Sequence, residues 1–439
     1  MKKIGKLVSA IAVLVAMTLL LCSCSSTGDF SAYMTAPRVA GEMSDISDAF
    51  YKAVGRSVTL SYPSRGDNLS AFVLEDIDGD GVNEALVFYT ADNSNNGVAP
   101  VRINVIDKHG DDWVSADDIV TASNSVDMVS FADVSGDGAK EAVVGLTSVT
   151  KNENKLSLFN FDGGKLNLVL QEDYTDFILS DMTGSGIDDL LVVNLKTVEK
   201  EATAKLYSVS GNEPVLNGTA YLDGNATGYA KLQEGTVGGT KAIYIDAYKG
   251  TTSMVTDIVF IKDGTLTNPF ISSAGAENEY TLRTSTEICR DCNGDGVLDI
   301  PFTKLMPGFE LRVSSERAYL TTWRSYDGAL FHDTLCGYFN TADGYMIRYP
   351  ELWIDAVTIT RDSSSHMLTF GVYDSIRNTV SNELFRIKRY AVGDYEQVDN
   401  SAFIELGRDD SYIYVARIVD STSEYSVDGE TLKQMFSLL

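Results

Sequence analysis

Four acidic loops in the chain combine residue types and spacing that can hold a divalent cation. Each loop opens with an aspartate, places oxygen-bearing side chains at alternate positions, carries glycines between them and has an acid at its ninth position. Carboxylate and carbonyl oxygens are the ligands that Ca²⁺ prefers, and glycine lets the backbone coil around one ion. The expected metal ligands are, loop by loop, Asp76, Asp78, Asp80 and Glu84; Asp133, Ser135, Asp137 and Glu141; Asp181 and Asp189; and Asp291, Asn293, Asp295 and Asp299.

The loops differ in the number of charged ligands that they offer. The first has four carboxylates, the second and fourth have three, and the third keeps two acids with Thr183 and Ser185 between them. Because the charge count sets affinity in such sites, we expect three calcium sites and a weaker third loop. The alternative for each loop, above all the third, is a metal-free turn rich in Asp and Asn that closes a hairpin.

The first loop is not an EF-hand. An EF-hand has a bidentate carboxylate at its twelfth position, where this chain has Val87. The apolar residues 85–89 that follow the loop have the composition of a β-strand. The loop is therefore expected to join two strands.

The loops recur along the chain with a rough period. Their first residues, Asp76, Asp133, Asp181 and Asp291, are separated by 57, 48 and 110 residues, so the last gap is two repeats wide. Within this gap, residues 229–245 have the pattern of a strand, a turn and a strand without the acids. A period near fifty residues predicts a repeat architecture of five units.

The pattern D-x-D-G-D-G-x-x-[DE] between strands resembles the FG-GAP/VCBS repeats of integrin-α-like β-propellers, over roughly residues 58–340. The resemblance implies a mainly β fold, with one four-stranded blade per repeat. It also implies that the loop side chains bind calcium, with a backbone carbonyl at position seven. We expect a propeller over residues 36–340, with about five blades and six or seven as alternatives.

An amphipathic helix is expected before the first blade. Val39, Met43, Ile46, Phe50 and Val54 recur every three to four residues and Gly55 follows them. This spacing puts the apolar side chains on one face, and the glycine ends the helix. The face is expected to pack against the first blade.

The last hundred residues have a different sequence pattern from the repeats that precede them. The order G-Y-x-I-x-Y-P-x-x-W from Gly344, followed by further strand-like segments, resembles PsbP/Mog1-like α+β domains attached to Gram-positive lipoproteins. We therefore expect a smaller α+β domain over residues 341–439. The helical spacing of Leu432, Met435, Phe436 and Leu439 predicts a helix at its end.

The N-terminus has the pattern of a bacterial lipoprotein signal. Lysines precede an apolar run over residues 7–21, and Leu21-Cys22-Ser23-Cys24 is similar to a lipobox. We expect a signal peptide over residues 1–24, lipid on Cys24 and a polar tether over 25–35. This predicts an extracytoplasmic protein held on the cell membrane, with an ordinary cleaved signal as the alternative.

The charge composition of the chain excludes one class of binding partner. The chain has 35 basic and 62 acidic residues, a formal charge of −27, and such a surface repels phosphate backbones. Nucleic acid is therefore excluded as the main partner. Cys289, Cys292 and Cys336 remain after the lipobox, and their pairing is left open.

No catalytic motif is found in the sequence. His109, His332 and His366 are scattered, and calcium binding accounts for the clustered acids. We expect no catalytic residues, and a cell-surface binding protein, not an enzyme, whose protein or glycan ligand lies on a propeller face. Two alternatives stay open: a purely structural envelope protein, and a polysaccharide-acting enzyme with two free carboxylates about 5–10 Å apart.

Overall fold

A computed structural model describes residues 38–439 except 92–98, 149–152, 363 and 396–400. The predicted signal peptide, the predicted lipidation site Cys24 and the predicted tether lie outside these residues. Within the described part of the chain, no helix is both long and apolar enough to cross a membrane.

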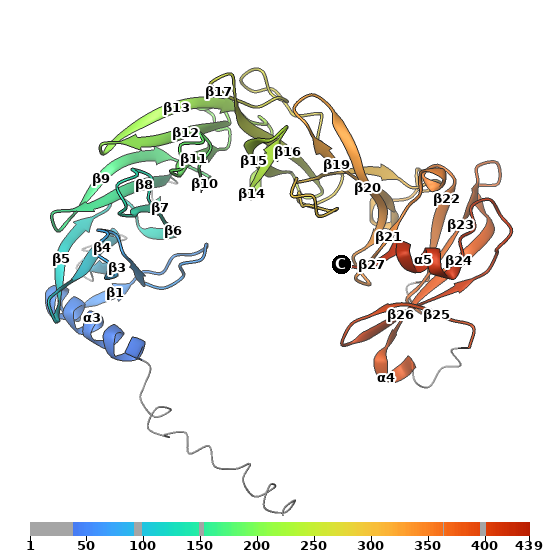
Figure 1. Ribbon diagram of the computed structural model, residues 1–439, viewed down its shortest axis with the longest axis horizontal. Helices are drawn as coiled ribbons and strands as arrows, with labels where there is room; N and C mark the ends of the chain where they lie inside the picture. The colour runs from blue at the N-terminus through green and yellow to red at the C-terminus, as the bar shows by residue number, and fades with distance from the viewer. Residues whose placement is uncertain (1–37, 92–98, 149–152, 363, 396–400) are drawn as a thin grey trace, which may run out of the picture. The chain divides into compact units, whose positions relative to one another are not determined.

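The protein is mainly β, with six antiparallel sheets and few helices (Figure 1). By compactness the chain divides into two units. The first comprises residues up to 129 with two short later segments. It contains α3 (Arg38–Val54), β1 (Val58–Leu60), β2 (Phe72–Glu75), β3 (Glu84–Ala91), β4 (Arg102–His109) and β5 (Asp112–Val120).

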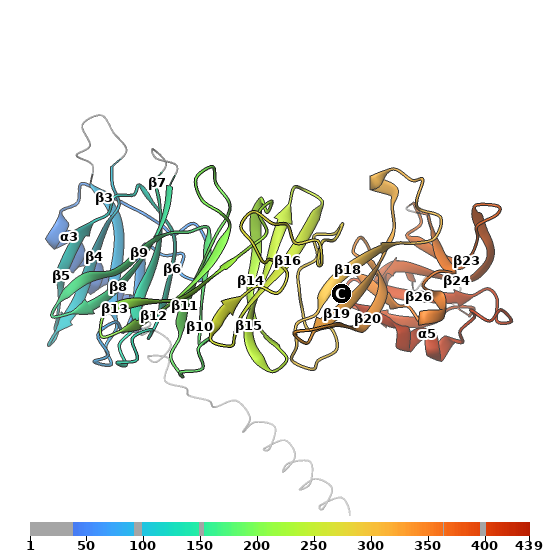
Figure 2. The ribbon, with the colours of Figure 1, turned by 90° about the horizontal axis from the view of Figure 1, so that it is seen from above.

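The second unit contains most of the second sheet and all of the four sheets that follow it. The second to fourth sheets are β6 (Ser125–Ala132), β7 (Glu141–Ser148), β8 (Glu153–Asp162) and β9 (Lys165–Asp173); β10 (Asp176–Ser180), β11 (Asp189–Asn194), β12 (Thr203–Ser210) and β13 (Glu213–Tyr221); and β14 (Gly228–Val237), β15 (Thr240–Lys249), β16 (Ser253–Lys262) and β17 (Thr265–Thr267). Each is ordered as its strands follow in the chain, and Figure 2 shows β14, β15 and β16 side by side.

The fifth sheet combines β18 (Ile300–Leu305), β19 (Tyr319–Tyr326), β20 (Phe331–Asn340), β21 (Tyr345–Arg348) and β27 (Phe436–Leu438). The sixth is β22 (Val357–Asp362), β23 (Met367–Asp374), β24 (Thr379–Ala391), β26 (Tyr412–Ile418) and β25 (Ile404–Arg408). The short helices are η1 (Ser314–Glu316), η2 (Glu351–Trp353), α4 (Val392–Tyr395) and α5 (Gly429–Met435). The fifth sheet contains strands from both sides of residue 340, so it crosses the boundary expected between the propeller and the C-terminal domain. A domain boundary at residue 340 stays a prediction.

The predicted N-terminal helix is confirmed. Ile46 and Phe50 of α3 are fully buried and pack against β3, where the rings of Phe50 and Tyr89 lie 5.2 Å apart. Gly55 follows with φ 85° and donates its N–H to the carbonyl of Tyr51, which ends the helix. The apolar face of α3 therefore forms part of the core of the first unit.

The second unit has cores between successive sheets. Leu191 and Val193 of β11 share one buried cluster with Ile243 and Ile245 of β15. Both faces of these strands are buried, and accordingly residues 190–193 of β11 are all apolar and residues 242–247 of β15 are apolar except for Asp246. The strand–turn–strand predicted without acids at residues 229–245 is confirmed as β14 and β15.

The five sheets from β1 to β21 match the number of repeats in the sequence, but they do not establish a propeller. The described strands form six separate sheets, and no closed barrel or propeller is detected among them. The mainly β fold with successive antiparallel sheets is confirmed; closure into a propeller is not.

The predicted C-terminal helix is wrong in its second half. α5 begins where Asp428 accepts a hydrogen bond from the N–H of Thr431, and ends at Met435. Residues 436–438 then form β27, which pairs with β21. The ring of Phe436 lies 5.4 Å from that of Tyr345, so burial against this sheet outweighs the helical spacing.

Candidate calcium loops and a histidine-lined hollow

The four acidic loops fold alike. The first three connect β2 to β3, β6 to β7 and β10 to β11, and the fourth precedes β18. In each loop the acid at position nine accepts a hydrogen bond from the backbone N–H of the residue at position two. The pairs are Glu84 with Ile77 (2.8 Å), Glu141 with Val134 (2.9 Å), Asp189 with Met182 (3.0 Å) and Asp299 with Cys292 (3.0 Å). The first aspartate accepts the sixth-position glycine N–H, as Asp76 from Gly81 (3.1 Å), Asp133 from Gly138 (3.0 Å), Asp181 from Gly186 (2.9 Å) and Asp291 from Gly296 (2.9 Å). The repeated sequence thus produces a repeated local structure.

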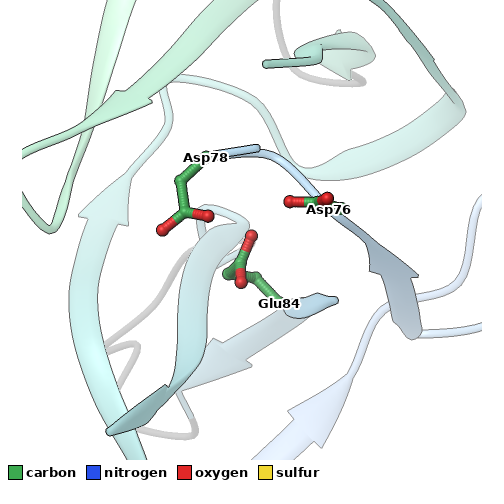
Figure 3. Close-up of side chains that lie close together, drawn as sticks. All are labelled: Asp76, Asp78 and Glu84. Atoms are coloured by element: carbon green, nitrogen blue, oxygen red, sulfur yellow. The ribbon is translucent and has the colours of Figure 1, made fainter. Parts of the chain in front are cut away.

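The first loop gathers three of its four acids. Ligand oxygens of Asp76, Asp78 and Glu84 all lie within 4.8 Å of one another, and among the described residues this is the one such group of acids, cysteines and histidines (Figure 3). Asp80 is not part of the group, and its Oδ1 accepts the N–H of Val82 at 2.7 Å.

Glu84 carries the feature of this group that most needs an explanation. The residue is fully buried, its Oε2 accepts the N–H of Ile77, and its Oε1 has no hydrogen-bond partner. Burial, with smaller contributions from Asp78 and other acids nearby, raises the pKa of Glu84 to about 7, against the opposing hydrogen bond from Ile77. A buried carboxylate oxygen without a partner is costly, and a cation beside it removes that cost.

In the other loops, hydrogen bonds from protein groups occupy more of the carboxylate oxygens. Asp189 accepts the N–H groups of both Met182 and Thr183. Asp299 accepts the hydroxyl of Thr334 on its second oxygen at 2.8 Å. Burial raises the pKa of Glu141, Asp189 and Asp299. Calcium sites in these loops stay predictions.

The fourth sheet has a buried ion pair and no acidic loop. Arg283 Nη2 lies 2.8 Å from Asp246 Oδ1, and both side chains are fully buried. Thr256 Oγ1 donates to Asp246 at 2.6 Å and accepts from Arg283 at 2.9 Å, while Cys289 donates its N–H to Asp246 at 2.8 Å. No motif predicts this pair, because its members are 37 residues apart in the chain.

A second cluster of titratable groups borders a hollow of about 250 Å³ at the start of β23. His366 Nδ1 lies 2.9 Å from Asp343 Oδ1, and Arg389 Nη2 lies 3.2 Å from the same oxygen. Asn340 donates to the other oxygen of Asp343 at 3.0 Å. His366 has φ 51°, a left-handed conformation that is uncommon outside glycine and that clusters at functional sites.

His366 differs from the other two histidines in its surroundings. His109 pairs with Asp107, two residues away in the chain, and His332 pairs with Asp327, five residues away. Neither of these histidines lines a described hollow. Asp343 lies 23 residues from His366 in the chain and is mostly buried, with 14% of its side chain exposed. Composition alone flagged the three histidines, and only the fold distinguishes this one.

The three described cysteines are all free in the structure. Burial raises the pKa of Cys289, Cys292 and Cys336. These thiols are therefore protonated at neutral pH and poorly reactive.

Comparisons with known proteins give no family. No family model matches, and no curated protein matches. Among solved structures, the chain is similar to an exotype rhamnogalacturonan lyase, YesX, at 10% identity and TM-score 0.27, covering 72% of this chain and 71% of that one. It is also similar to a Bacillus licheniformis rhamnogalacturonan lyase, at 12% identity and TM-score 0.30, covering 84% of this chain and 73% of that one.

These matches correct one expectation from the sequence. We expected that the chain is not an enzyme, whereas both matched structures are enzymes, so this exclusion is withdrawn. TM-scores of 0.27 and 0.30 carry no argument about reaction or substrate. The evidence for function must therefore come from the chain's own residues.

Proposed function

We propose that this is an extracytoplasmic protein, anchored by lipid on Cys24, whose acidic loops bind calcium and stiffen successive β-sheets. In this proposal the sheets are blades of an FG-GAP/VCBS-like propeller, and a PsbP/Mog1-like domain follows them. The calcium is structural: it neutralises acids that repel one another and fixes the turn between two strands.

The observation that carries the calcium proposal is the unpartnered Oε1 of Glu84. It lies in a group with Asp76 and Asp78 that brings three carboxylates around one point. Three carboxylates so close repel one another unless a cation lies between them. The matching hydrogen bonds in the other loops support the same use there, with affinity that falls as carboxylates are lost.

Chelation tests the calcium proposal. The full chain in EDTA is expected to melt at least about 3 °C lower than in millimolar calcium, because one site filled to a hundred times its dissociation constant adds about 2.7 kcal/mol. Differential scanning calorimetry measures the difference. Asp76→Asn is expected to reduce it, while the matched change Asp181→Asn, in the loop with fewest acids, leaves most of it. An identical melting temperature in EDTA and in calcium contradicts the proposal.

For the biochemical activity we propose action on a polysaccharide, with ligand binding alone as the second candidate. The hollow beside His366 supports this. Asp343 holds Nδ1 of His366, which fixes the ring and leaves Nε2 free to act as a proton donor or acceptor. The structure offers this histidine in place of the free pair of carboxylates expected for a polysaccharide-acting enzyme.

Substitution of His366 tests the activity. His366→Gln is expected to lower the rate of polysaccharide cleavage by about 10²- to 10⁴-fold, the usual contribution of general acid–base catalysis. Release of new chain ends from a panel of envelope and plant-type polysaccharides measures it. His332→Gln is the matched control, since His332 also pairs with an aspartate but lies outside the hollow. Polysaccharide that binds but is never cleaved would favour the second candidate.

A further inference from the structure

The hollow beside His366 continues into a larger one in the same unit. The second hollow, of about 550 Å³, shares Tyr338, Phe339, Thr341 and Arg361 with the first. We name the two together the arginine groove. Arg361, at the end of β22, and Arg317, which precedes β19, both line the second hollow.

Two arginines of this groove lack carboxylate partners in a strongly acidic chain. Arg361 Nη2 donates to the hydroxyl of the buried Tyr338 at 2.6 Å, and Arg317 Nε donates to the carbonyl of Arg312 at 3.1 Å. Within the described part of the chain, neither guanidinium has an ion pair. Both guanidinium groups therefore keep N–H donors that no carboxylate of the described residues binds.

The acids that line the groove do not neutralise these arginines. Asp343 is bound by Arg389 and His366. Asp362, the neighbour of Arg361, accepts the hydroxyls of Ser364 and Ser365 at 2.6 and 2.7 Å. Glu287 lines the second hollow and forms no described ion pair. The two arginines therefore keep donors for an anion, while the carboxylate of Glu287 repels one, so the carboxylates of a ligand are expected to lie at the arginines and away from Glu287.

The remaining lining has the chemistry of a polyol site. The second hollow is lined mostly by threonine and serine side chains, among them Thr251, Thr284, Thr303 and Thr321, together with Tyr319. Threonine hydroxyls both donate and accept, as sugar hydroxyls do, and an aromatic ring covers the apolar face of a sugar. A compact anion such as phosphate needs neither.

We propose that the arginine groove binds an oligosaccharide that carries carboxylates, with Arg361 and Arg317 as its carboxylate-binding residues. The inference rests on the proposed action on a polysaccharide and adds the class of that polysaccharide: a polymer of uronic acid. Guanidinium binds carboxylate through two parallel hydrogen bonds, and Tyr338 holds Arg361 in one orientation for this. The threonine-lined hollow then receives the sugar hydroxyls of the next units.

Calorimetric titration of the full chain tests the proposal, with calcium fixed at one concentration. The probes are a tetramer of galacturonic acid, the same tetramer with its carboxylates reduced to alcohols, tetraglutamate and inorganic phosphate. The uronic acid tetramer is expected to bind, and the reduced tetramer at least about tenfold more weakly. Equal binding of both sugars overturns the assignment of the arginines, and preference for tetraglutamate or phosphate overturns the sugar class.

Matched variants locate the binding. Arg361→Gln and Arg317→Gln are each expected to weaken binding of the uronic acid tetramer by about 10- to 100-fold. Arg348→Gln makes the same charge change on β21, outside the groove, and is expected to leave binding unchanged. Equal loss in all three variants overturns the site. The two proposals can fail separately. Binding of the uronic acid tetramer by an unaltered chain that cleaves no polysaccharide overturns the proposed activity and leaves the groove assignment standing. Cleavage that is lost in His366→Gln but unchanged in Arg361→Gln and Arg317→Gln overturns the groove assignment alone.

Discussion

Arg283→Ala is expected to lower the free energy of unfolding by about 3–5 kcal/mol, the usual cost of removing one partner from a buried ion pair. The substitution leaves the Asp246 carboxylate fully buried without its cation. The substitution also removes the guanidinium N–H that donates a hydrogen bond to Thr256 Oγ1. The lost stability therefore includes that of a connected hydrogen-bond network. Urea unfolding followed by tryptophan fluorescence measures the change.

Two variants control this experiment. Arg377→Ala removes an arginine whose ion pair with Asp374 lies on the surface, with 76% of the arginine side chain exposed. Its expected effect is within about 0.5 kcal/mol. The double variant Arg283→Met with Asp246→Asn is expected to recover part of the loss, because no buried charge is left behind. A loss below about 1 kcal/mol for Arg283→Ala would show that the pair is not buried as described.

Without calcium, the stability of the protein is expected to fall as the pH rises from about 5 to about 8, and Glu84 accounts for part of this fall. Burial raises the pKa of Glu84 from 4.5 in the unfolded chain to about 7 in the folded one. The folded state therefore binds a proton that the unfolded state has released, and stability is lost with rising pH until the folded pKa is passed. In the proposed site a cation would take the place of that proton, so calcium is expected to remove this pH dependence.

Glu84→Gln isolates this contribution from that of other groups. Burial also raises the pKa of Asp257, to about 6, and this dependence persists in the variant. Asp327, Asp362 and Asp420 have pKa values lowered to about 2, so their stabilisation is lost only below about pH 4. Urea unfolding at pH 5 and pH 8, with EDTA and with calcium, should show a smaller fall for Glu84→Gln in EDTA. Equal falls for both proteins in EDTA would contradict the role of Glu84.

The features that the sequence predicted well are local ones. The loop of Asp76, its glycines and Glu84 are nine residues that fold on themselves, so spacing alone was sufficient. The same is true of the helix that contains Ile46 and Phe50, since one turn of periodicity defines its buried face.

What the sequence did not predict depends on contacts between distant residues. Asp246 with Arg283, and Asp343 with His366, are 37 and 23 residues apart, and no spacing rule joins them. Phe436 has helical spacing yet lies in a strand, because an available sheet edge at β21 decided its conformation. Closure of the sheets into a ring is also a long-range property, and the repeat period alone does not determine it.

The buried guanidinium of Arg283 has a consequence for how the sheets respond to their surroundings. A metal ion bound in an acidic loop, as proposed here, would be exchangeable, so its occupancy would follow the concentration of that ion in the surrounding solution. The positive charge of Arg283 is covalently attached and stays in the fourth sheet at any ionic composition. In calcium-poor water, amide hydrogens around Glu84 would then exchange with solvent well before those around Asp246, and this middle segment would act as the durable part from which the rest refolds.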